Sequence, residues 1–163
     1  MINNDSNKII VRSGRRLGKT YAMIFHMLWY AETHKNSSQL VVAPRGAQID
    51  KIYEELRNLI DESDVLPETV QHSKQYPQTI EFKNGSIIRG FSAGTSSGGK
   101  GNSVRGQGAD WIYLDECDFL DEKDLNSIMG VQLEDVGKIG IWAASTPSGA
   151  KKLFYQWCRN STG

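Results

Sequence analysis

The 163-residue sequence predicts an α/β fold: a mostly parallel central sheet with helices on both faces and a β-hairpin insertion. Two observations support this prediction. Short apolar runs that suit buried strands alternate with longer segments of helical periodicity, an order typical of parallel sheets. The exception is the segment 78–91, where apolar residues alternate with others around an Asn84-Gly85 pair. Such a pair between alternating runs is the strongest short-range signal of a hairpin.

Strands and helices alternate in the N-terminal part of the chain. The apolar run 9–11 suits a buried strand, and residues 20–34 are apolar nearly all round, which predicts a helix buried between the sheet and its neighbours. A short buried strand is expected at 39–43, where Pro44 stops it. Residues 47–62 then place their apolar side chains on one face, as an amphipathic helix does.

The remaining elements follow the hairpin. The glycine-rich segment 94–108 is expected to form a mobile loop. Two further apolar runs, 111–114 and 139–144, suit buried strands, and residues 153–157 open a final helix. The buried strands expected outside the hairpin can therefore build a sheet that is mostly parallel.

The composition limits the classes of protein to which the chain can belong. Hydrophobic residues make up 39% and charged residues 23%, as in one soluble domain, which we expect to span 1–163. No apolar run approaches a membrane span and no secretory signal precedes the domain, so we expect a cytoplasmic protein without a membrane partner. Two cysteines and three scattered histidines form no disulfide framework and no metal-ligand spacing. With zero formal net charge, any nucleic-acid surface must be a local patch.

The segment between the first strand and the first helix, VRSGRRLGKT, ends in Gly18-Lys19-Thr20. A glycine-containing turn in this place can wrap backbone N–H groups around nucleotide phosphates, and we interpret it as a Walker A loop. Ser13 stands where the pattern has its first glycine, and the alternative is a polar turn that only joins strand to helix. The expected nucleotide-binding residues are Ser13, Gly14, Arg15, Arg16, Leu17, Gly18, Lys19 and Thr20.

Two carboxylates, Asp115 and Glu116, follow the strand 111–114. In an open α/β sheet, ligands bind at the carboxyl ends of the strands. In a nucleotide hydrolase, Asp115 would hold Mg²⁺ together with the Thr20 hydroxyl, and Glu116 would orient and deprotonate the attacking water. The alternative is a solvated acidic strand end, but the position after a Walker A loop favours the functional interpretation.

The run IWAASTPSG, 141–149, ends a buried strand in two hydroxyl residues, Ser145 and Thr146. If this strand lies between the strands that precede the Walker A loop and the Asp115-Glu116 pair, the hydroxyls would lie near the γ-phosphate. They could then sense its loss and pass the signal to moving parts. The alternative is that Ser-Thr-Pro simply turns the chain out of the strand.

Arginines bear on the finer mechanism. Arg15 lies inside the phosphate loop, and Arg105 lies eleven residues before Glu116. A guanidinium can neutralise charge on the transferred phosphoryl group, and when a neighbouring subunit supplies it, hydrolysis is coupled to assembly. The alternatives are a solvated loop arginine for Arg105 and a structural or DNA-facing role for Arg15 and Arg16.

Taken in order, these segments resemble the ATPase domain of the large terminase subunit of tailed bacteriophages, from about Lys8 to Arg159. The segments are SGRRLGKT, VVAPRGAQ, FKNGSIIRGFSA, the loop ending Val104-Arg105-Gly106, YLDECDF and AASTPSG. The resemblance implies an ASCE-type P-loop NTPase fold and a motor that uses Mg-ATP to translocate double-stranded DNA into a preformed capsid. It further implies a homo-oligomeric ring in the host cytoplasm, with the portal and the small terminase subunit as partners.

The resemblance also assigns roles by matching position. Asp115 would be the Walker B carboxylate and Glu116 the catalytic one, and Lys19 with Thr20 would bind phosphate and Mg²⁺. The Ser145-Thr146-Pro147 segment looks like the coupling motif, and Arg105 looks like a trans-acting finger. Arg15 resembles the arginine common in the family's phosphate loop, and Pro44 with Gln48 resembles a segment that helicase-like motors turn toward nucleic acid.

Two departures from the family pattern accompany the resemblance. Only residues 1–12 precede the loop, whereas family members usually carry a longer segment there that binds the adenine base. The C-terminal nuclease domain is not expected in this chain, which ends at Gly163. Two alternatives remain: a helicase-like or remodelling P-loop ATPase acting on nucleic acid, or a nucleotide-binding fragment without turnover.

Overall fold

The computed structural model describes residues 8–93, 108–121, 123–125, 128, 139–149 and 153–160. Within them, seven strands form one sheet in the order β1-β7-β6-β2-β5-β4-β3. The expected glycine-rich loop lies outside these ranges except for its last residue, and Arg105 lies outside them as well. None of the helices in the described ranges has the length and apolarity that a membrane crossing requires.

Five strands run parallel and form most of the sheet. They are β1 (Lys8–Arg12), β7 (Gly140–Ser145), β6 (Trp111–Leu114), β2 (Ser38–Ala43) and β5 (Ile87–Ser92). Parallel strands are typically covered on both faces and have nearly continuous apolar sequences, and for this reason the sequence predicts β1, β7, β6 and β2 correctly, whereas β5 was expected as a strand of the hairpin. The last strand in sequence, β7, pairs with both β1 and β6. It therefore lies where the hypothesis about residues 141–149 required.

Two antiparallel strands, β4 (Gln78–Phe82) and β3 (Val70–Gln75), extend the sheet beyond β5. The β4–β5 hairpin turns at Asn84-Gly85, where Gly85 has a φ of 86°, so the hairpin prediction is confirmed. The sequence did not indicate β3, because an exposed edge strand needs no apolar residues and this one is mostly polar and exposed.

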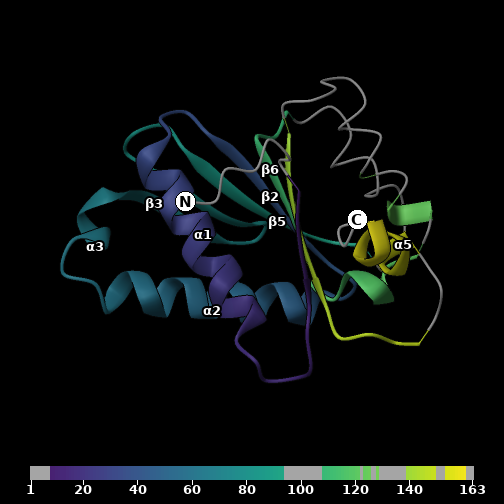
Figure 1. The fold of residues 1–163 in the computed structure, drawn as a ribbon. Coiled ribbons are helices and arrows are strands. Elements are labelled where there is room, and N and C mark those ends of the chain that lie inside the picture. The colour runs from purple at the N-terminus through teal and green to yellow at the C-terminus, as the bar shows by residue number, and fades with distance from the viewer. Residues whose placement is uncertain are drawn as a thin grey trace, which may run out of the picture.

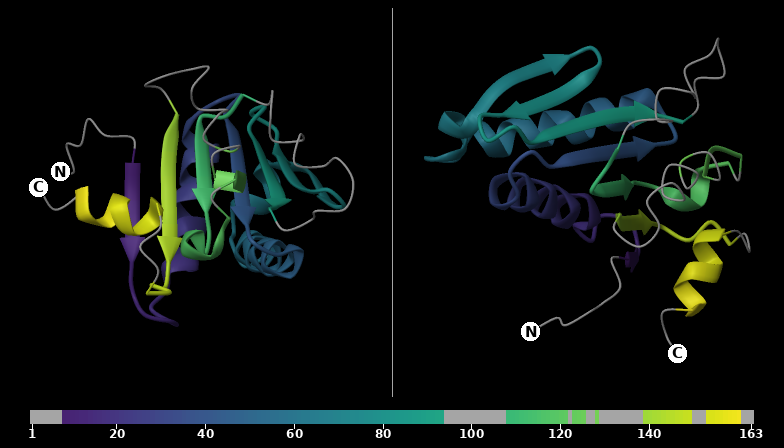
Figure 2. Two further views of the ribbon diagram at one scale, coloured as in Figure 1. Left: turned by 90° about the vertical axis from the view of Figure 1, so that its right-hand side faces the viewer. Right: turned by 90° about the horizontal axis from the view of Figure 1, so that it is seen from above.

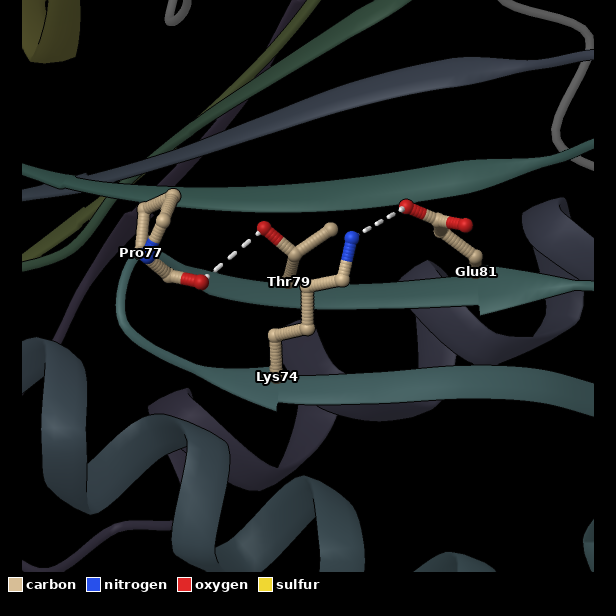
Figure 3. Close-up of polar contacts among 4 residues, drawn as sticks. All are labelled: Lys74, Pro77, Thr79 and Glu81. Atoms are coloured by element: carbon tan, nitrogen blue, oxygen red, sulfur yellow. Dashed lines mark hydrogen bonds and ion pairs between the residues drawn. The ribbon is translucent and has the colours of Figure 1, made fainter.

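The turn between β3 and β4 carries two polar contacts that Figure 3 shows. Lys74 Nζ lies 3.7 Å from Glu81 Oε1, and Thr79 Oγ1 donates a hydrogen bond of 3.1 Å to the Pro77 carbonyl oxygen. The Tyr76–Pro77 peptide bond in this turn is cis. An exposed ion pair stabilises a protein little, so these contacts define the turn more than they stabilise the fold.

Helices cover both faces of the sheet, as predicted, and Figures 1 and 2 show α1 and α2 on one face and α5 on the other. The helices are α1 (Lys19–Thr33), α2 (Gly46–Asp61), the short α3 (Leu66–Thr69) and α5 (Leu153–Asn160), with a 3₁₀ turn η2 (Cys117–Phe119) after β6. The core is correspondingly divided in two. One cluster packs α1 and α2 on the sheet, and the other packs η2 and α5 on the opposite face.

The prediction that α1 is buried all round is wrong for one of its faces. Tyr21, Phe25 and Trp29, which are spaced one turn apart, are about half exposed at 47, 58 and 56%. The opposite side of the helix, with Met23 and Met27, is fully buried against the sheet. Apolar residues on a surface helix face are compatible with the helical pattern, so periodicity alone could not reveal which side stays uncovered.

Candidate functional site

The predicted site residues meet at the carboxyl ends of β1, β7 and β6, where a cavity of about 540 Å³ opens. Cavities of this size commonly hold small ligands. Three segments line it: residues 15–21 with Ile24, the pair Asp115-Glu116, and one side of α2. The Ser13–Thr20 loop and the two carboxylates therefore share one cavity, although a long stretch of sequence separates them.

The Ser13–Thr20 loop presents the free amino terminus of α1. Gly18, which precedes the helix, has a φ of 75°, a left-handed conformation that glycine adopts without strain. Among the residues that the structure describes, no side chain caps this helix end, and no acidic residue stands in its first turn. Its first N–H groups and the positive end of the helix dipole are thus available to an anion such as phosphate.

Lys19 is held at the base of this loop, with only 8% of its surface exposed. Its ammonium donates hydrogen bonds to the carbonyl oxygens of Gly14 at 2.8 Å and Ser13 at 3.3 Å, and to Thr146 Oγ1 at 3.2 Å. Ser13 and Gly14 therefore position the ammonium through their carbonyl groups and do not line the cavity themselves.

Asp115 is buried, with 7% exposure, and lines the same cavity. Burial raises the pKa of its carboxyl to about 6, and the Glu116 charge adds to this rise. A hydrogen bond from the Glu116 backbone N–H opposes the rise, as do the Lys19 and Lys51 charges. Among the described residues, no hydrogen-bond partner reaches its Oδ1 atom. The cavity is also lined by Thr20, and a buried carboxylate oxygen together with a hydroxyl is a suitable ligand set for a hard cation such as Mg²⁺.

Glu116 has a left-handed backbone conformation, with φ 48° and ψ 44°. This conformation costs a non-glycine residue about 1–3 kcal/mol, and such strain persists where the surrounding structure enforces it. Its Oε2 atom accepts hydrogen bonds from Ser145 Oγ at 3.2 Å and from the Thr146 N–H at 3.4 Å. The end of β7 thus fixes the carboxylate at the edge of the cavity.

Ser145 and Thr146 contact both charged residues at the site. Ser145 Oγ bonds to Glu116, while Thr146 Oγ1 accepts from Lys19. Neither residue lines the cavity itself. The hydroxyls at the end of β7 therefore connect the carboxylate after β6 to the lysine after β1, which is the arrangement that a coupling element would need.

Helix α2 forms one wall of the cavity, and of the residues in this wall only Gln48 was named as a functional candidate from the sequence. The α2 residues in this wall are Gln48, Lys51, Ile52 and Glu55. Gln48 Oε1 accepts a hydrogen bond of 3.0 Å from the Arg45 N–H, so it closes the first turn of α2. Tyr21 donates a hydrogen bond of 2.8 Å to Glu55 Oε2 and links α1 to α2. Nothing in the local pattern of α2 could show that its polar side faces the Ser13–Thr20 loop.

Comparison with protein families gives one match. The model of a family described as "Terminase large subunit, T4likevirus-type, N-terminal" matches residues 10–162. Comparison with curated protein sequences gives no match.

Solved structures show the same fold at low sequence identity. The HK97 bacteriophage large terminase has a TM-score of 0.80 and 16% identity, over 96% of this chain and 33% of that one. The large terminase ATPase domain of Thermus phage P74-26 has a TM-score of 0.76 and 18% identity, over 95% and 65% of the two chains. A large terminase from a thermophilic bacteriophage, in complex with ADP, has a TM-score of 0.66 and 19% identity, over 88% and 34%.

These neighbours confirm the expected fold, a P-loop NTPase fold of the ASCE type with a mostly parallel sheet. The chain covers less than two thirds of the length of each of these three solved chains. The similarity in fold therefore concerns only the part of each solved chain that this chain matches. The roles of individual residues are inferred from the geometry of the cavity.

Proposed function

The chain belongs to the family of T4-like large terminase N-terminal domains, and from this membership we propose that it is the Mg-dependent ATP-hydrolysing motor domain of a viral DNA-packaging terminase. One observation carries the proposal. The free amino terminus of α1, the Lys19 ammonium and the unpaired Asp115 oxygen converge on one cavity. Neighbours solved in complex with ADP and with ATP-gamma-S support a nucleotide as the ligand.

In this proposal the nucleotide's phosphates bind at the Ser13–Thr20 loop. The first N–H groups of α1 donate to phosphate oxygens, and the residues at positions 14–18 enclose them. Lys19 exchanges its hydrogen bonds to the Ser13 and Gly14 carbonyls and to Thr146 for bonds to phosphate oxygens. In the new hydrogen bonds both partners are charged, whereas the carbonyl and hydroxyl acceptors that they replace are neutral, so the new bonds are stronger.

Asp115 and the Thr20 hydroxyl are the residues that would hold Mg²⁺. Such an ion would neutralise part of the negative charge of the phosphates. The unpaired Oδ1 of Asp115 fits this role, because a ligand oxygen must be free of other partners when the ion arrives. Above a pH of about 6 the carboxyl is mostly ionised, as a ligand must be.

Glu116 orients the attacking water and accepts its proton. Its carboxylate lines the cavity and is fixed by Ser145 and Thr146. Because Thr146 also contacts Lys19, a change in the phosphates at Lys19 alters the contacts of the same β7 end that holds Glu116. Ser145 and Thr146 thereby act as the coupling element of the motor.

Arginines supply the remaining positive charge. Arg15 lines the cavity and neutralises charge on the transferred phosphoryl group from within the same subunit. Arg105, which lies outside the described residues, acts in trans on the site of a neighbouring subunit in a homo-oligomeric ring. Double-stranded DNA, the portal and the small terminase subunit are the partners, in the host cytoplasm, and these assignments rest on family membership.

Substitution of Lys19 tests the nucleotide site. Lys19→Ala removes the phosphate contact, so ATP binding should weaken and phosphate release should fall by at least about 100-fold. Lys83→Ala, which changes an exposed lysine in the hairpin turn, is the matched control and should behave as wild type. Turnover by Lys19→Ala at the wild-type rate would contradict the assignment of the loop.

Glu116→Gln separates binding from chemistry in the same assay. The variant keeps the phosphate contacts and loses the base, so it should bind ATP and release phosphate about 10²–10⁴-fold more slowly. If wild-type protein binds ATP without hydrolysis, and Glu116→Gln leaves this unchanged, the chain is a nucleotide-binding fragment rather than an ATPase.

A further inference from the structure

A fourth cationic residue, Lys51, lines the cavity without a role in the proposed chemistry. It belongs to the second turn of α2, is exposed, and shares the cavity wall with Lys19, Asp115 and Glu116. In the part of the chain that the structure describes, no hydrogen bond or ion pair engages its ammonium. Lys51 is therefore a positive charge at the site that is available to a ligand.

The position of Lys51 is fixed by the packing of α2. Ile49, Ile52 and Tyr53, on either side of it in sequence, are buried in the core between α2 and the sheet. At the start of the helix, Arg45 and Gln48 form reciprocal capping contacts. The backbone of Lys51 is thus held rigidly, while its four-carbon side chain can follow a phosphate oxygen.

The direction from which Lys51 approaches differs from that of the loop cations. Lys19 and Arg15 belong to the segment between β1 and α1, whereas Lys51 comes from the helix that follows β2. Strand β6, which ends in Asp115 and Glu116, lies between β2 and β7 in the sheet. The Lys51 charge is also close enough to act electrostatically on Asp115. Lys51 therefore reaches the cavity from an element other than the loop, and it shares the cavity with the two carboxylates, which serve the terminal phosphate in the proposed function.

We propose that Lys51 is a second phosphate-binding cation, which contacts the terminal phosphate of a nucleoside triphosphate and makes the site prefer triphosphate over diphosphate. This inference rests on the proposed function, because it requires the cavity to bind a nucleotide. A lysine that bound the first two phosphates would support ADP and ATP equally. A lysine at the terminal phosphate supports only ATP.

Binding of ATP-gamma-S and of ADP, each with Mg²⁺, to the full chain tests the inference. Lys51→Ala should raise the Kd for ATP-gamma-S by about tenfold or more and the Kd for ADP by less than about twofold. Lys51→Arg keeps the positive charge and should retain most of the preference for triphosphate. Lys35→Ala, an exposed lysine after α1, is the matched control and should leave both constants unchanged.

The melting temperatures of all variants should match that of wild type, because the Lys51 side chain is exposed and contributes no packing. If Lys51→Ala binds both nucleotides as wild type does, or loses both equally, the inference is overturned while the proposed function stands. If wild-type protein binds neither nucleotide, the proposed function fails first and the inference falls with it.

Discussion

Asp115 shows how a residue suited to binding a cation can lower the stability of the folded protein. Its carboxyl is buried and its Oδ1 atom lacks a hydrogen-bond partner within the described residues, so burial raises its pKa to about 6. Sites built to hold a cation commonly sacrifice stability in this way until the ligand arrives. The cost falls on the protein without a bound cation, because no positive ligand then compensates the carboxylate.

The pH dependence of stability follows from this raised pKa. In the unfolded chain, Asp115 should titrate near its ordinary pKa, below its folded value of about 6. The protonated carboxyl favours the fold, so the contribution of Asp115 is fully present near pH 4 and is lost as the pH rises through 6. Asp115→Asn stays neutral, and should therefore be more stable than wild type at pH 8 by about 2 to 3 kcal/mol and nearly equal at pH 4.

Urea unfolding at both pH values, in the presence of a chelator, measures this difference. Asp64→Asn replaces an exposed aspartate and serves as the control, with no difference from wild type at either pH. A gain in stability for Asp115→Asn that persisted undiminished at pH 4 would show that something other than the charge is responsible.

At the residue level, the sequence marked the candidate site residues but not the side chains that surround them. Lys19, Asp115 and Glu116 stand out because motif spacing marks them, and the structure brings all three to one cavity. Lys51 and Glu55 carry no such mark. They reach the cavity because α2 follows β2, which lies beside β6, and that neighbour relationship is a property of the sheet order.

The close contact between α2 and β5 determines where α2 presents its polar side. Gly90 of β5 lies beneath the helix, and a Cβ atom added there would meet Ile49 Cγ2 and Tyr53 Cε2 at 2.7 Å. Contacts this short force side chains or backbone to move. Glycine at this position therefore permits the helix that carries Gln48 and Lys51 to approach the sheet.

Gly90→Ala should accordingly destabilise the fold by about 1–3 kcal/mol, as overpacking of a core does. Gly46→Ala is the matched substitution, because a Cβ atom there meets nothing within 4 Å. It should be neutral or slightly stabilising. Urea unfolding of both variants checks the prediction, and equal stability of the two would show that α2 does not press on β5 at this position.

The predictability of each element depended on its environment. Strands β2, β6 and β7 were predicted because their burial leaves few polar residues in them, and β5 was predicted from the hairpin signal at Asn84-Gly85. Helix α2 was predicted because it buries one face only. Strand β3 was missed since its pairing comes from backbone hydrogen bonds with β4 and its side chains face solvent. The exposed side of α1 was misjudged because Tyr21, Phe25 and Trp29 are as apolar as core residues.

At the scale of the whole molecule, the sheet order brings together segments that the sequence separates. Inserting β7 between β1 and β6 places Ser145 and Thr146 between the lysine and the carboxylate that they contact. A helix after β1 and a helix after β2 then close the cavity on one face of the sheet. The described residues thus bring the loop before α1, the acidic pair after β6 and the end of β7 together from a single chain.

An arginine supplied by a neighbouring subunit would couple this site to assembly, and a mixing experiment can test it. Neither Arg105→Ala nor Glu116→Gln should hydrolyse ATP when alone, since each lacks one required group at every interface. In an equimolar mixed ring, an Arg105→Ala subunit keeps Glu116, and a Glu116→Gln neighbour can donate Arg105 to it. If the two variants assemble in random order, a subunit with Glu116 meets a neighbour with Arg105 at about one quarter of the interfaces. Turnover should therefore recover to about one quarter of the wild-type rate.

The mixture gives different results when Arg105 acts within its own chain and when it acts on a neighbouring subunit. If Arg105 acts within its own chain, every site in the mixture lacks either the arginine or the glutamate, and mixing restores nothing. Co-assembly must be shown on the same mixture, by the size of the complex that an affinity tag on only one variant retrieves. Absence of recovery in a mixture that demonstrably co-assembles would therefore place Arg105 outside the neighbouring site, whereas partial recovery requires two subunits to build one catalytic centre.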